Sequence, residues 1–278
     1  MNRPSTGTQG KRSVATSQYA TGSARERIER ALREAGKAVD SLVAADLAQI
    51  EHFHTLGLRA TESLTQLAAI TAEDSVLDAG SGIGGTARFL AGHIGCRVTS
   101  IDLTSEYCEV ARWLNGAVGL DNLIDVREGD VLDLPFADAS FDVVVSQHVQ
   151  MNISDKAGLY REARRVLTPA GRLALWDVTA GPNQSLRFPA PWADRAEQSH
   201  LVTPEQLRAL LAAAGFDVLA WNDLTEPSKQ SMHALANAPR QPLGLHVFVP
   251  DFGTKAANHL DNLDHNRIRL IQAVLGAA

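Results

Sequence analysis

One stretch constrains the fold more than any other: residues 75–102 read SVLDAGSGIGGTARFLAGHIGCRVTSID. A short β-branched segment leads into four glycines within six positions, an amphipathic helical pattern follows, and a second apolar segment ends on Asp102. Glycine has no Cβ, so this turn permits positive φ and lets a ligand approach the backbone, while the free N–H groups of the following helix favour an anionic group. The pattern predicts a strand–turn–helix–strand unit with a nucleotide-type pocket where the first strand ends.

The position of Asp102 fits such a pocket, because this residue lies about twenty positions past the glycines, the distance at which a second parallel strand brings a carboxylate to a ribose diol. The alternative for Asp102 is a strand-terminal acid solvated at a loop. Gly80, Gly82 and Gly85 also satisfy GxGxxG, so the unit by itself is consistent with a nicotinamide cofactor as well as with S-adenosylmethionine. The choice depends on the rest of the chain.

Motifs further along the chain favour S-adenosylmethionine. The chain continues with GDVLDLPFADASFDVVVSQHV over residues 129–149 and, after a helical segment, with VLTPAGRLALWDV over residues 166–178. Together with DAGSGIGG and Asp102, these segments resemble the class I S-adenosylmethionine-dependent methyltransferases. Within that class the chain is similar to the small-molecule group that includes sarcosine/dimethylglycine, ubiquinone-pathway and sugar O-methyltransferases. The resemblance covers roughly residues 53–216, and it says more about the cofactor than about the substrate.

The resemblance implies a set of cofactor contacts at the carboxyl ends of the first four strands. Asp78 then helps to hold the methionine end of the cofactor, and Asp130 with Val131 recognises the adenine edge above Leu103. A turn-forming role is the alternative for both Asp78 and Asp130. The residues predicted to bind S-adenosylmethionine are Asp78, Gly80, Gly82, Gly84, Asp102, Leu103, Asp130, Val131 and Gln147.

The predicted fourth strand runs into the polar sequence SQHVQMN over residues 146–152. Polar side chains at the carboxyl end of a core strand are costly to bury, so several should face the crevice. The similar sugar O-methyltransferases have a histidine after the fourth strand and an aspartate after the fifth, which fall on His148 and Asp177. The resemblance therefore predicts that His148 accepts the proton of a hydroxyl acceptor while Asp177 orients its imidazole. The alternative for His148 is an imidazole satisfied by a backbone carbonyl.

Four residues are predicted to contact the substrate. Phe53 and His54 belong to HFHTLGL, which occupies the place where related enzymes fold an N-terminal segment over the cofactor, and Asn152 ends the polar run after the fourth strand. Trp192 lies in a proline-rich segment and is the fourth. Aromatic faces attract cations, so Trp176, Trp192 and Trp221 are candidates for a cage around a substituted ammonium, with core packing as the alternative for Trp176 and Trp221. The histidines have no metal-ligand spacing, so no metal is predicted.

Hydrophobic periodicity predicts an α/β fold with a seven-stranded, mostly parallel sheet and helices on both faces. The resemblance implies that this is the Rossmann-like methyltransferase sheet, here with an N-terminal helical extension and an inserted lid. One or two helices are expected over residues 24–52 and another over 59–70. The predicted strands, with helices between the first five, are residues 75–78, 97–102, 124–128, 141–147, 172–177, 216–222 and 267–274. Two segments interrupt the alternation, 181–203 and 225–265. Both follow strands whose carboxyl ends face the cofactor, so both are predicted to form a substrate lid.

Composition limits the remaining possibilities. With 278 residues and 45% apolar content, the chain is expected to form one catalytic domain over residues 24–278, preceded by a flexible tail over 1–23 that is rich in Ser, Thr, Gly and Gln. A net charge of −6 argues against a sequence-independent grip on nucleic acid. No apolar run is long enough to span a bilayer or to act as a signal peptide, so a cytoplasmic location is predicted.

The sequence as a whole predicts an enzyme that transfers the methyl group of S-adenosylmethionine to a nitrogen or oxygen of a small-molecule acceptor by in-line displacement. Two alternatives from other classes stay open: a nicotinamide-dependent oxidoreductase that uses the same glycine turn, and a non-catalytic cofactor-binding module. The sequence does not determine the acceptor, the choice between nitrogen and oxygen, the need for a general base, or the oligomeric state, for which a homodimer is one option.

Overall fold

The computed structural model describes residues 22–183, 185–239 and 241–277, so all but the last two residues of the predicted tail lie outside the described part of the chain. The strands are β1 (Ser75–Ala79), β2 (Arg97–Asp102), β3 (Ile124–Glu128), β4 (Phe141–Gln147), β5 (Leu167–Ala180), β6 (Phe216–Asp223) and β7 (Ile268–Ala277). The helices are α2 (Ala24–Glu34), α3 (Ala44–Leu47), α4 (Leu58–Leu67), α5 (Gly85–Phe89), α6 (Ser105–Ala117), α7 (Lys156–Val166), α8 (Pro204–Ala213), α9 (Thr225–Ala236) and α10 (Phe252–Asp264). None of these described helices is long and apolar enough to cross a membrane.

The seven strands form one sheet in the order β3-β2-β1-β4-β5-β7-β6. Strands β1 to β5 run parallel, whereas β7 is antiparallel to both of its neighbours. This confirms the predicted seven-stranded, mostly parallel Rossmann-like sheet. The predicted ranges for β2, β3 and β4 are correct to the residue, and β5 is longer than predicted at both ends.

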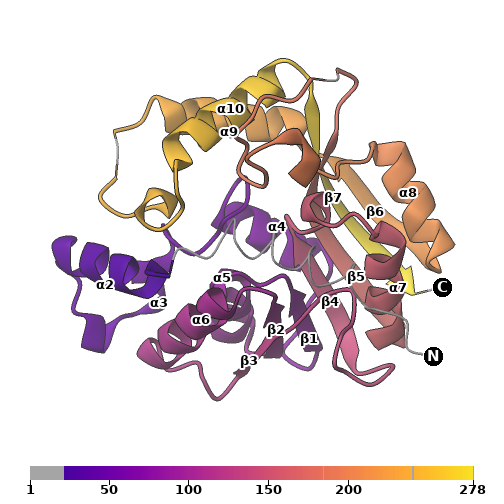
Figure 1. Ribbon diagram of the computed structural model, residues 1–278. Helices are drawn as coiled ribbons and strands as arrows, with labels where there is room; N and C mark the ends of the chain where they lie inside the picture. Colours follow the sequence, from indigo (N-terminus) through magenta and orange to yellow (C-terminus); the bar gives the residue numbers. More distant parts are fainter. Residues whose placement is uncertain (1–21, 184, 240, 278) are drawn as a thin grey trace, which may run out of the picture.

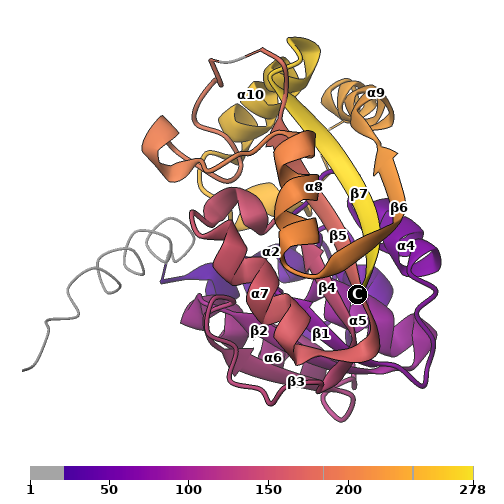
Figure 2. The ribbon, with the colours of Figure 1, turned by 90° about the vertical axis from the view of Figure 1, so that its right-hand side faces the viewer.

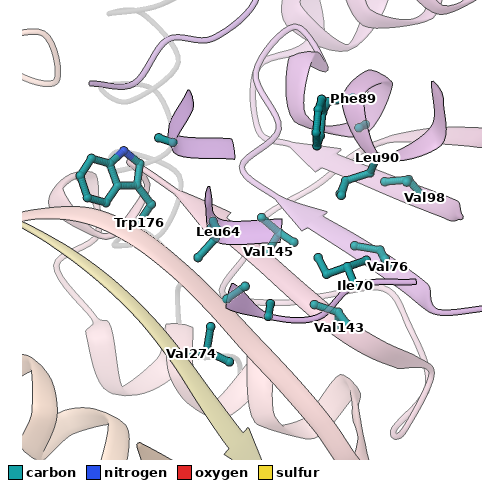
Figure 3. Close-up of a cluster of buried hydrophobic side chains, with 14 of the residues drawn as sticks. Leu64, Ile70, Val76, Phe89, Leu90, Val98, Val143, Val145, Trp176 and Val274 are labelled. Carbon is teal, nitrogen blue, oxygen red and sulfur yellow. The ribbon is translucent and has the colours of Figure 1, made fainter. Parts of the chain in front are cut away.

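Alternate residues along each central strand face two separate hydrophobic layers. Val76, Val143 and Val145 pack into a layer with α4, α5, α6 and α10, and Figure 3 shows these side chains close to Leu64 of α4 and Leu90. Leu77 and Val144 point the other way, into a layer with α7 and α8, which Figure 2 shows in front of the sheet. Because both faces are covered, the central strands are apolar on both sides, as expected for buried parallel strands.

The connection between β3 and β4 contradicts the prediction that helices separate the first five strands. Residues 129–140 contain no helix; they form a loop with a single bridge between Asp130 and Asp133. Val131 and Leu134 from this loop are buried in the layer that contains α7, with Phe136 packed against it. Three apolar side chains, spaced by acids and a proline, thus cover this part of the sheet in place of a helix.

The segment before the sheet is less helical than predicted. Helix α2 ends before Gly36, which has a left-handed φ of +75°, and only a 3-10 turn (Val39–Ser41) and the four-residue α3 follow. Its buried residues, among them Ile28, Leu47 and Ile50, pack with Tyr107 of α6 and with Phe248. Phe248 comes from the segment between β6 and β7, so two parts of the chain about 200 residues apart join in one layer beside the sheet, at the side of Figure 1 where α2 and α3 lie.

Candidate active site

A cleft lies at the carboxyl ends of β1, β2 and β4, and we call it the glycine-turn cleft. It brings together most of the residues that the sequence predicted for the site. The predicted residues that line it are Phe53, His54, Asp78, Gly80, Gly82, Asp102, Leu103, Asp130, Val131, Gln147, His148 and Asn152. Three predicted residues do not line it: Gly84, Asp177 and Trp192. Gly84 precedes α5 with a left-handed φ and lies against the side chains of Arg88 and Ala111.

The glycine turn is held to the end of β2 by Asp102. The Gly82 N–H donates to Oδ2 of Asp102 at 2.8 Å, and the Thr104 N–H donates to Oδ1 at 2.9 Å. Gly82 has a φ of +54° and open space where a Cβ would stand, so the backbone itself faces the cleft. Both carboxylate oxygens of Asp102 thus accept bonds from backbone amides that line the cleft.

Gly85 has a different role, which the motif does not reveal. A Cβ at this position would overlap the backbone carbonyl oxygen of Glu51, so the glycine allows the N-terminal segment to cross the start of α5 in close contact. Glu51 is fixed there by Arg88, whose Nε donates to Oε2 of Glu51 at 2.8 Å. The last glycine of GxGxxG therefore positions the segment that carries Phe53 and His54.

Asp78 is a buried acid with a free acceptor. Its side chain is 2% exposed, and Oδ2 has no hydrogen-bond partner among the described residues. Burial, followed by the negative charge of Asp102, raises the pKa of Asp78 to about 7. A cationic donor in the cleft would satisfy this oxygen and return the carboxyl group to its ionised form.

The side chain of Gln147, at the end of β4, is hydrogen-bonded to two helices. Its Nε2 donates to Oγ1 of Thr86 in α5 at 2.8 Å and to Oγ1 of Thr61 in α4 at 3.3 Å. The remaining side-chain oxygen, Oε1, is buried without a partner among the described residues. The two threonines were not predicted from sequence, because isolated threonines in helices carry no pattern of their own.

His148 follows β4 in a left-handed backbone conformation with a φ of +54°, which is uncommon for a residue with a Cβ and is found often at functional sites. Its N–H donates to the Trp176 carbonyl at 2.7 Å, and its ring stacks on Trp176 with centroids 6.0 Å apart. Nε2 is buried and has no hydrogen-bond partner among the described residues. Burial, with the nearby His54 and His259, holds the pKa of His148 well below its usual value, so the imidazole is neutral at pH 7.

Asp177 does not form the predicted pair with His148. Its Oδ2 accepts from the N–H groups of Val149 and Gln150 at 3.0 and 2.9 Å, its Oδ1 accepts from Val178, and no hydrogen bond to His148 is found within the described residues. Burial raises the pKa of Asp177 to about 7. The acid therefore fixes the turn that follows His148 through two backbone amides and does not contact the imidazole itself.

A second cavity adjoins the first, and we call it the histidine cavity. It is lined by Phe53, His54, Thr55, His148, Pro191, Trp192, Met232, Leu245, Phe252, Ala256 and His259. Four of these residues also line the glycine-turn cleft: Phe53, His54, His148 and Pro191. The two cavities thus meet at these four residues, and His148 is one of them. Both segments predicted to form a lid contribute, with Pro191 and Trp192 from one and five residues from the other.

His259 is a site residue that the sequence did not predict. It is 3% exposed and belongs to a buried face of α10 that also carries Lys255, Asn258 and Asn262. A polar helix face normally faces solvent, so sequence patterning places these side chains outside. Here the Nε2 of His259 lies 3.0 Å from Oγ1 of Thr55, and its Nδ1 has no partner among the described residues.

The three tryptophans that are candidates for a cation cage do not line one common cavity. Trp176 is fully buried and donates to the Thr55 carbonyl at 3.0 Å. Trp221 lies on β6 under the guanidinium of Arg208, 4.1 Å from its ring centre, and lines neither cavity. Only Trp192 reaches the histidine cavity, with its Nε1 bonded to Ser199 at 2.9 Å. Within the described ranges no group of three or more histidines, cysteines or acids is arranged to hold a metal ion.

Comparison with known proteins identifies the sheet and its first motifs. Residues 77–175 match the family model for a methyltransferase domain. The chain is 33% identical over 176 residues to a glycine/sarcosine/dimethylglycine N-methyltransferase of Actinopolyspora halophila, which covers 63% of this chain and 31% of the relative. It is also 33% identical over 168 residues to a sarcosine/dimethylglycine N-methyltransferase of Halorhodospira halochloris, which covers 60% of each. The chain thus spans less than two thirds of the length of either relative.

A solved structure agrees over the whole chain. The geranyl diphosphate C-methyltransferase of Streptomyces coelicolor A3(2), solved with Mg²⁺, geranyl-S-thiolodiphosphate and S-adenosyl-L-homocysteine, has a TM-score of 0.73 at 15% identity and covers 100% of both chains. At this identity the likeness concerns the fold. The family match, the relatives and the fold together show that residues 77–175 are a methyltransferase domain, built on the Rossmann-like sheet of the class I S-adenosylmethionine-dependent methyltransferases.

Proposed function

We propose that this protein transfers the methyl group of S-adenosylmethionine to an oxygen or nitrogen of a small-molecule acceptor. The observation that carries the proposal is the junction of the two cavities at His148. One cavity has the strand ends and the glycine turn of the methyltransferase domain, and the other opens directly beside it. A methyl donor in the first cavity and an acceptor in the second would meet where the two cavities adjoin.

The residues of the glycine-turn cleft fit S-adenosylmethionine. The unpartnered Oδ2 of Asp78 suits the ammonium of the methionine end, and the carboxylate of Asp102 at the end of β2 suits the ribose. Asp130, Val131 and Leu103 line the same cleft and are assigned to adenine by the family resemblance.

The charges of the cleft favour this cofactor over a nicotinamide dinucleotide. Its described lining includes four acids, Glu51, Asp78, Asp102 and Asp130, and no lysine or arginine. Glu51 is paired with Arg88, whereas neither Asp78 nor Asp102 forms an ion pair with a described residue. Acids attract the positive sulfonium and ammonium of S-adenosylmethionine, whereas the two phosphates of a dinucleotide would face negative charge without a compensating cation. The glycine turn alone does not distinguish the two cofactors, but its surroundings do.

Bound S-adenosylmethionine supplies a methyl group on a cationic sulfur, and in the transfer the S–C bond breaks with its electron pair left on sulfur while the acceptor forms a bond to the same carbon. The protein's own contribution is to place the acceptor and to exclude water, and Phe53, Pro191 and Phe248 cover the cleft for that purpose. For a hydroxyl acceptor, the neutral His148 can take the proton at Nε2. Asp177 positions His148 through the backbone of the following turn.

The test is a pair of binding titrations followed by a transfer assay. We expect S-adenosylmethionine to bind with a stoichiometry of one and NAD⁺ not to bind, and we expect labelled methyl to reach at least one member of a panel of amines, phenols, sugars and isoprenoid quinones. Binding of NAD⁺ without binding of S-adenosylmethionine would favour the oxidoreductase. A cytoplasmic location and the absence of nucleic-acid substrates are part of the same proposal and rest on the composition and the net charge of −6.

A further inference from the structure

We propose that the methyl acceptor is an uncharged, largely apolar hydroxyl compound that binds in the histidine cavity with its hydroxyl group at His148. The inference rests on the proposed methyl transfer and specifies the class of its acceptor. It follows from the uncharged lining of the cavity, from the neutral protonation state of its histidines, and from the pairing of nearby basic residues with other groups.

The lining of the histidine cavity carries no formal charge. Its walls are mainly apolar, and among the described residues that form them there is no aspartate, glutamate, lysine or arginine. The apolar walls come from Phe53, Trp192, Met232, Leu245 and Phe252. An ion that enters such a site loses its water without gaining a partner of opposite charge, which is strongly unfavourable. The cavity therefore selects against both carboxylates and ammonium groups.

The histidines do not supply the missing charge. Burial lowers the pKa of His54 to about 4 and that of His259 to about 4, and it holds the pKa of His148 well below its usual value. All three imidazoles are neutral near pH 7. They thus act as neutral hydrogen-bonding groups in an apolar setting, not as anion binders.

Two imidazole nitrogens in this cavity lack partners. Nε2 of His148 and Nδ1 of His259 are both buried and unbonded among the described residues. His259 is held in place by Thr55, which lies 3.0 Å from its other nitrogen. A buried imidazole nitrogen without a partner favours a ligand that brings a hydroxyl group, because a hydroxyl both donates and accepts. His148, at the junction with the cleft, is the partner for the hydroxyl that reacts.

Several basic residues close in sequence to the two cavities belong to other contacts, as Lys229 of α9 does with Glu226 at 3.7 Å. Lys255 is next in sequence to Ala256 of the cavity wall, but its Nζ is paired with Asp194 at 3.0 Å. Arg88 beside the glycine turn is bonded to Glu51 and to Asn115. An amino-acid acceptor such as the sarcosine named for the relatives carries a carboxylate, and no described residue of the cavity could pair with it. The acceptor of this chain thus differs in charge from theirs.

For a hydroxyl acceptor, the bonds and the proton of the methyl transfer are all accounted for. The hydroxyl oxygen forms the new C–O bond as the S–C bond breaks, the electron pair of that bond stays on sulfur, and the hydroxyl proton passes to Nε2 of His148. The imidazolium that results returns its proton to solvent when the products leave. No oxidant, reductant or metal is required.

Three phenols that differ only at the end of a short tether test the inference: tyrosol is neutral, tyramine is cationic and para-hydroxyphenylacetate is anionic near pH 7. Their dissociation constants are measured by ligand-observed NMR on the protein saturated with S-adenosylhomocysteine. We expect tyrosol to bind at least about tenfold more tightly than either charged phenol. Binding of tyrosol that is equal to or weaker than that of a charged phenol overturns the inference. Failure of S-adenosylhomocysteine to bind in the first place overturns the proposed function instead.

A charged substitution in the histidine cavity provides a second test of the inference. Met232→Lys adds a cation to the cavity wall, and Met232→Leu is the matched control that keeps the wall apolar. In Met232→Lys the ratio of the dissociation constants of para-hydroxyphenylacetate and tyrosol should fall by at least about tenfold, whereas Met232→Leu should preserve the order seen in the parent. An unchanged ratio in Met232→Lys, with S-adenosylhomocysteine still bound, shows that acceptors do not occupy this cavity.

Discussion

The glycine-turn cleft and the histidine cavity differ in how the chain builds them. The cleft is made from the ends of neighbouring strands and the turns that follow them, so its residues come from short motifs such as DAGSGIGG. The cavity is made from side chains of four separate segments: the one before α4, the turn after β4 that carries His148, the one after β5, and the one between β6 and β7. The cleft therefore depends mainly on the sheet and its turns, whereas the cavity depends mainly on segments outside the sheet.

The two regions also differ in charge. The described lining of the cleft carries four acids, whereas that of the histidine cavity carries none. A cationic donor and a neutral acceptor are thus drawn to different sides of His148. The experiments below separate the two regions by asking which substitutions change binding in the cleft and which change only the transfer.

The largest effect is expected at the junction. His148→Asn removes the imidazole but keeps a residue type that tolerates positive φ, so the turn should survive. For a hydroxyl acceptor the rate at saturating cofactor should fall by about 10²–10⁴-fold, the usual contribution of a general base. Affinity for S-adenosylhomocysteine, measured by calorimetry, should stay unchanged, and the exposed His93→Asn serves as the control. A loss of less than about tenfold would make His148 a structural residue.

The next effect belongs to the cleft alone. Gly82→Val forces a β-branched residue into a left-handed conformation and places its side chain where the backbone faces the ligand. Affinity for S-adenosylhomocysteine should fall by roughly 100-fold while the circular dichroism spectrum stays native. Gly116→Val is the matched control, because Gly116 is an exposed helical glycine with open space around it. Equal affinities in a folded Gly82→Val protein would contradict the assignment of the cleft.

A smaller change in binding is expected from Asp78→Asn, which removes the charge beside the expected ammonium. Hydrogen bonds to charged groups contribute about 1.5–3 kcal/mol, so affinity for S-adenosylmethionine should fall roughly ten- to a hundredfold. Because the pKa of Asp78 is raised to about 7, the affinity of the parent should weaken as the pH falls below 7, and that dependence should disappear in the variant. The exposed Asp125→Asn is the control. If the affinity of the parent protein for S-adenosylmethionine is constant from about pH 8 to 5.5, Asp78 does not contact the ligand.

The smallest effect concerns stability and tests the neutrality of the histidine cavity. The folded pKa of His259 is lowered to about 4, so below about pH 6.5 the unfolded chain binds a proton there that the folded chain does not, and stability falls as the pH falls. Asp78 and Asp177, both raised to about 7, act in the opposite direction and lose stability as the pH rises from about 4 to 7.

Urea unfolding of the parent and of His259→Gln between about pH 5 and 6.5 measures the contribution of His259. The slope of the free energy of unfolding against pH should be shallower in His259→Gln by about one proton, or about 1.4 kcal/mol per pH unit. His93→Gln, at an exposed position, is the control and should keep the slope of the parent. Identical slopes in the parent and in His259→Gln would mean that His259 is protonated in the folded protein and that the cavity is charged.

Sequence patterns predicted the cleft well and the histidine cavity poorly. The strand ends that deliver Asp78, Asp102 and Gln147 follow from apolar runs and glycines that lie close in the chain, and the structure gathers these residues as expected. The prediction for His148 and Asp177 was right that His148 follows β4, but Asp177 lies within β5, three residues before its end, and is not hydrogen-bonded to the imidazole among the described residues. Asp177 has its oxygens bonded to the backbone amides of the turn after His148, an arrangement that depends on the local path of the chain.

By itself, the sequence determined the seven-stranded sheet and the half of the site that follows its strand ends. Those features depend on local periodicity and on glycine stereochemistry, and both are properties of short segments. Tertiary structure alone decided that the polar face of α10 is buried, that Trp221 lies away from the site, and that His54, His148 and His259 share one cavity. Those outcomes depend on which surfaces far apart in the chain cover each other, and burial, not residue type, then sets the charge of each imidazole.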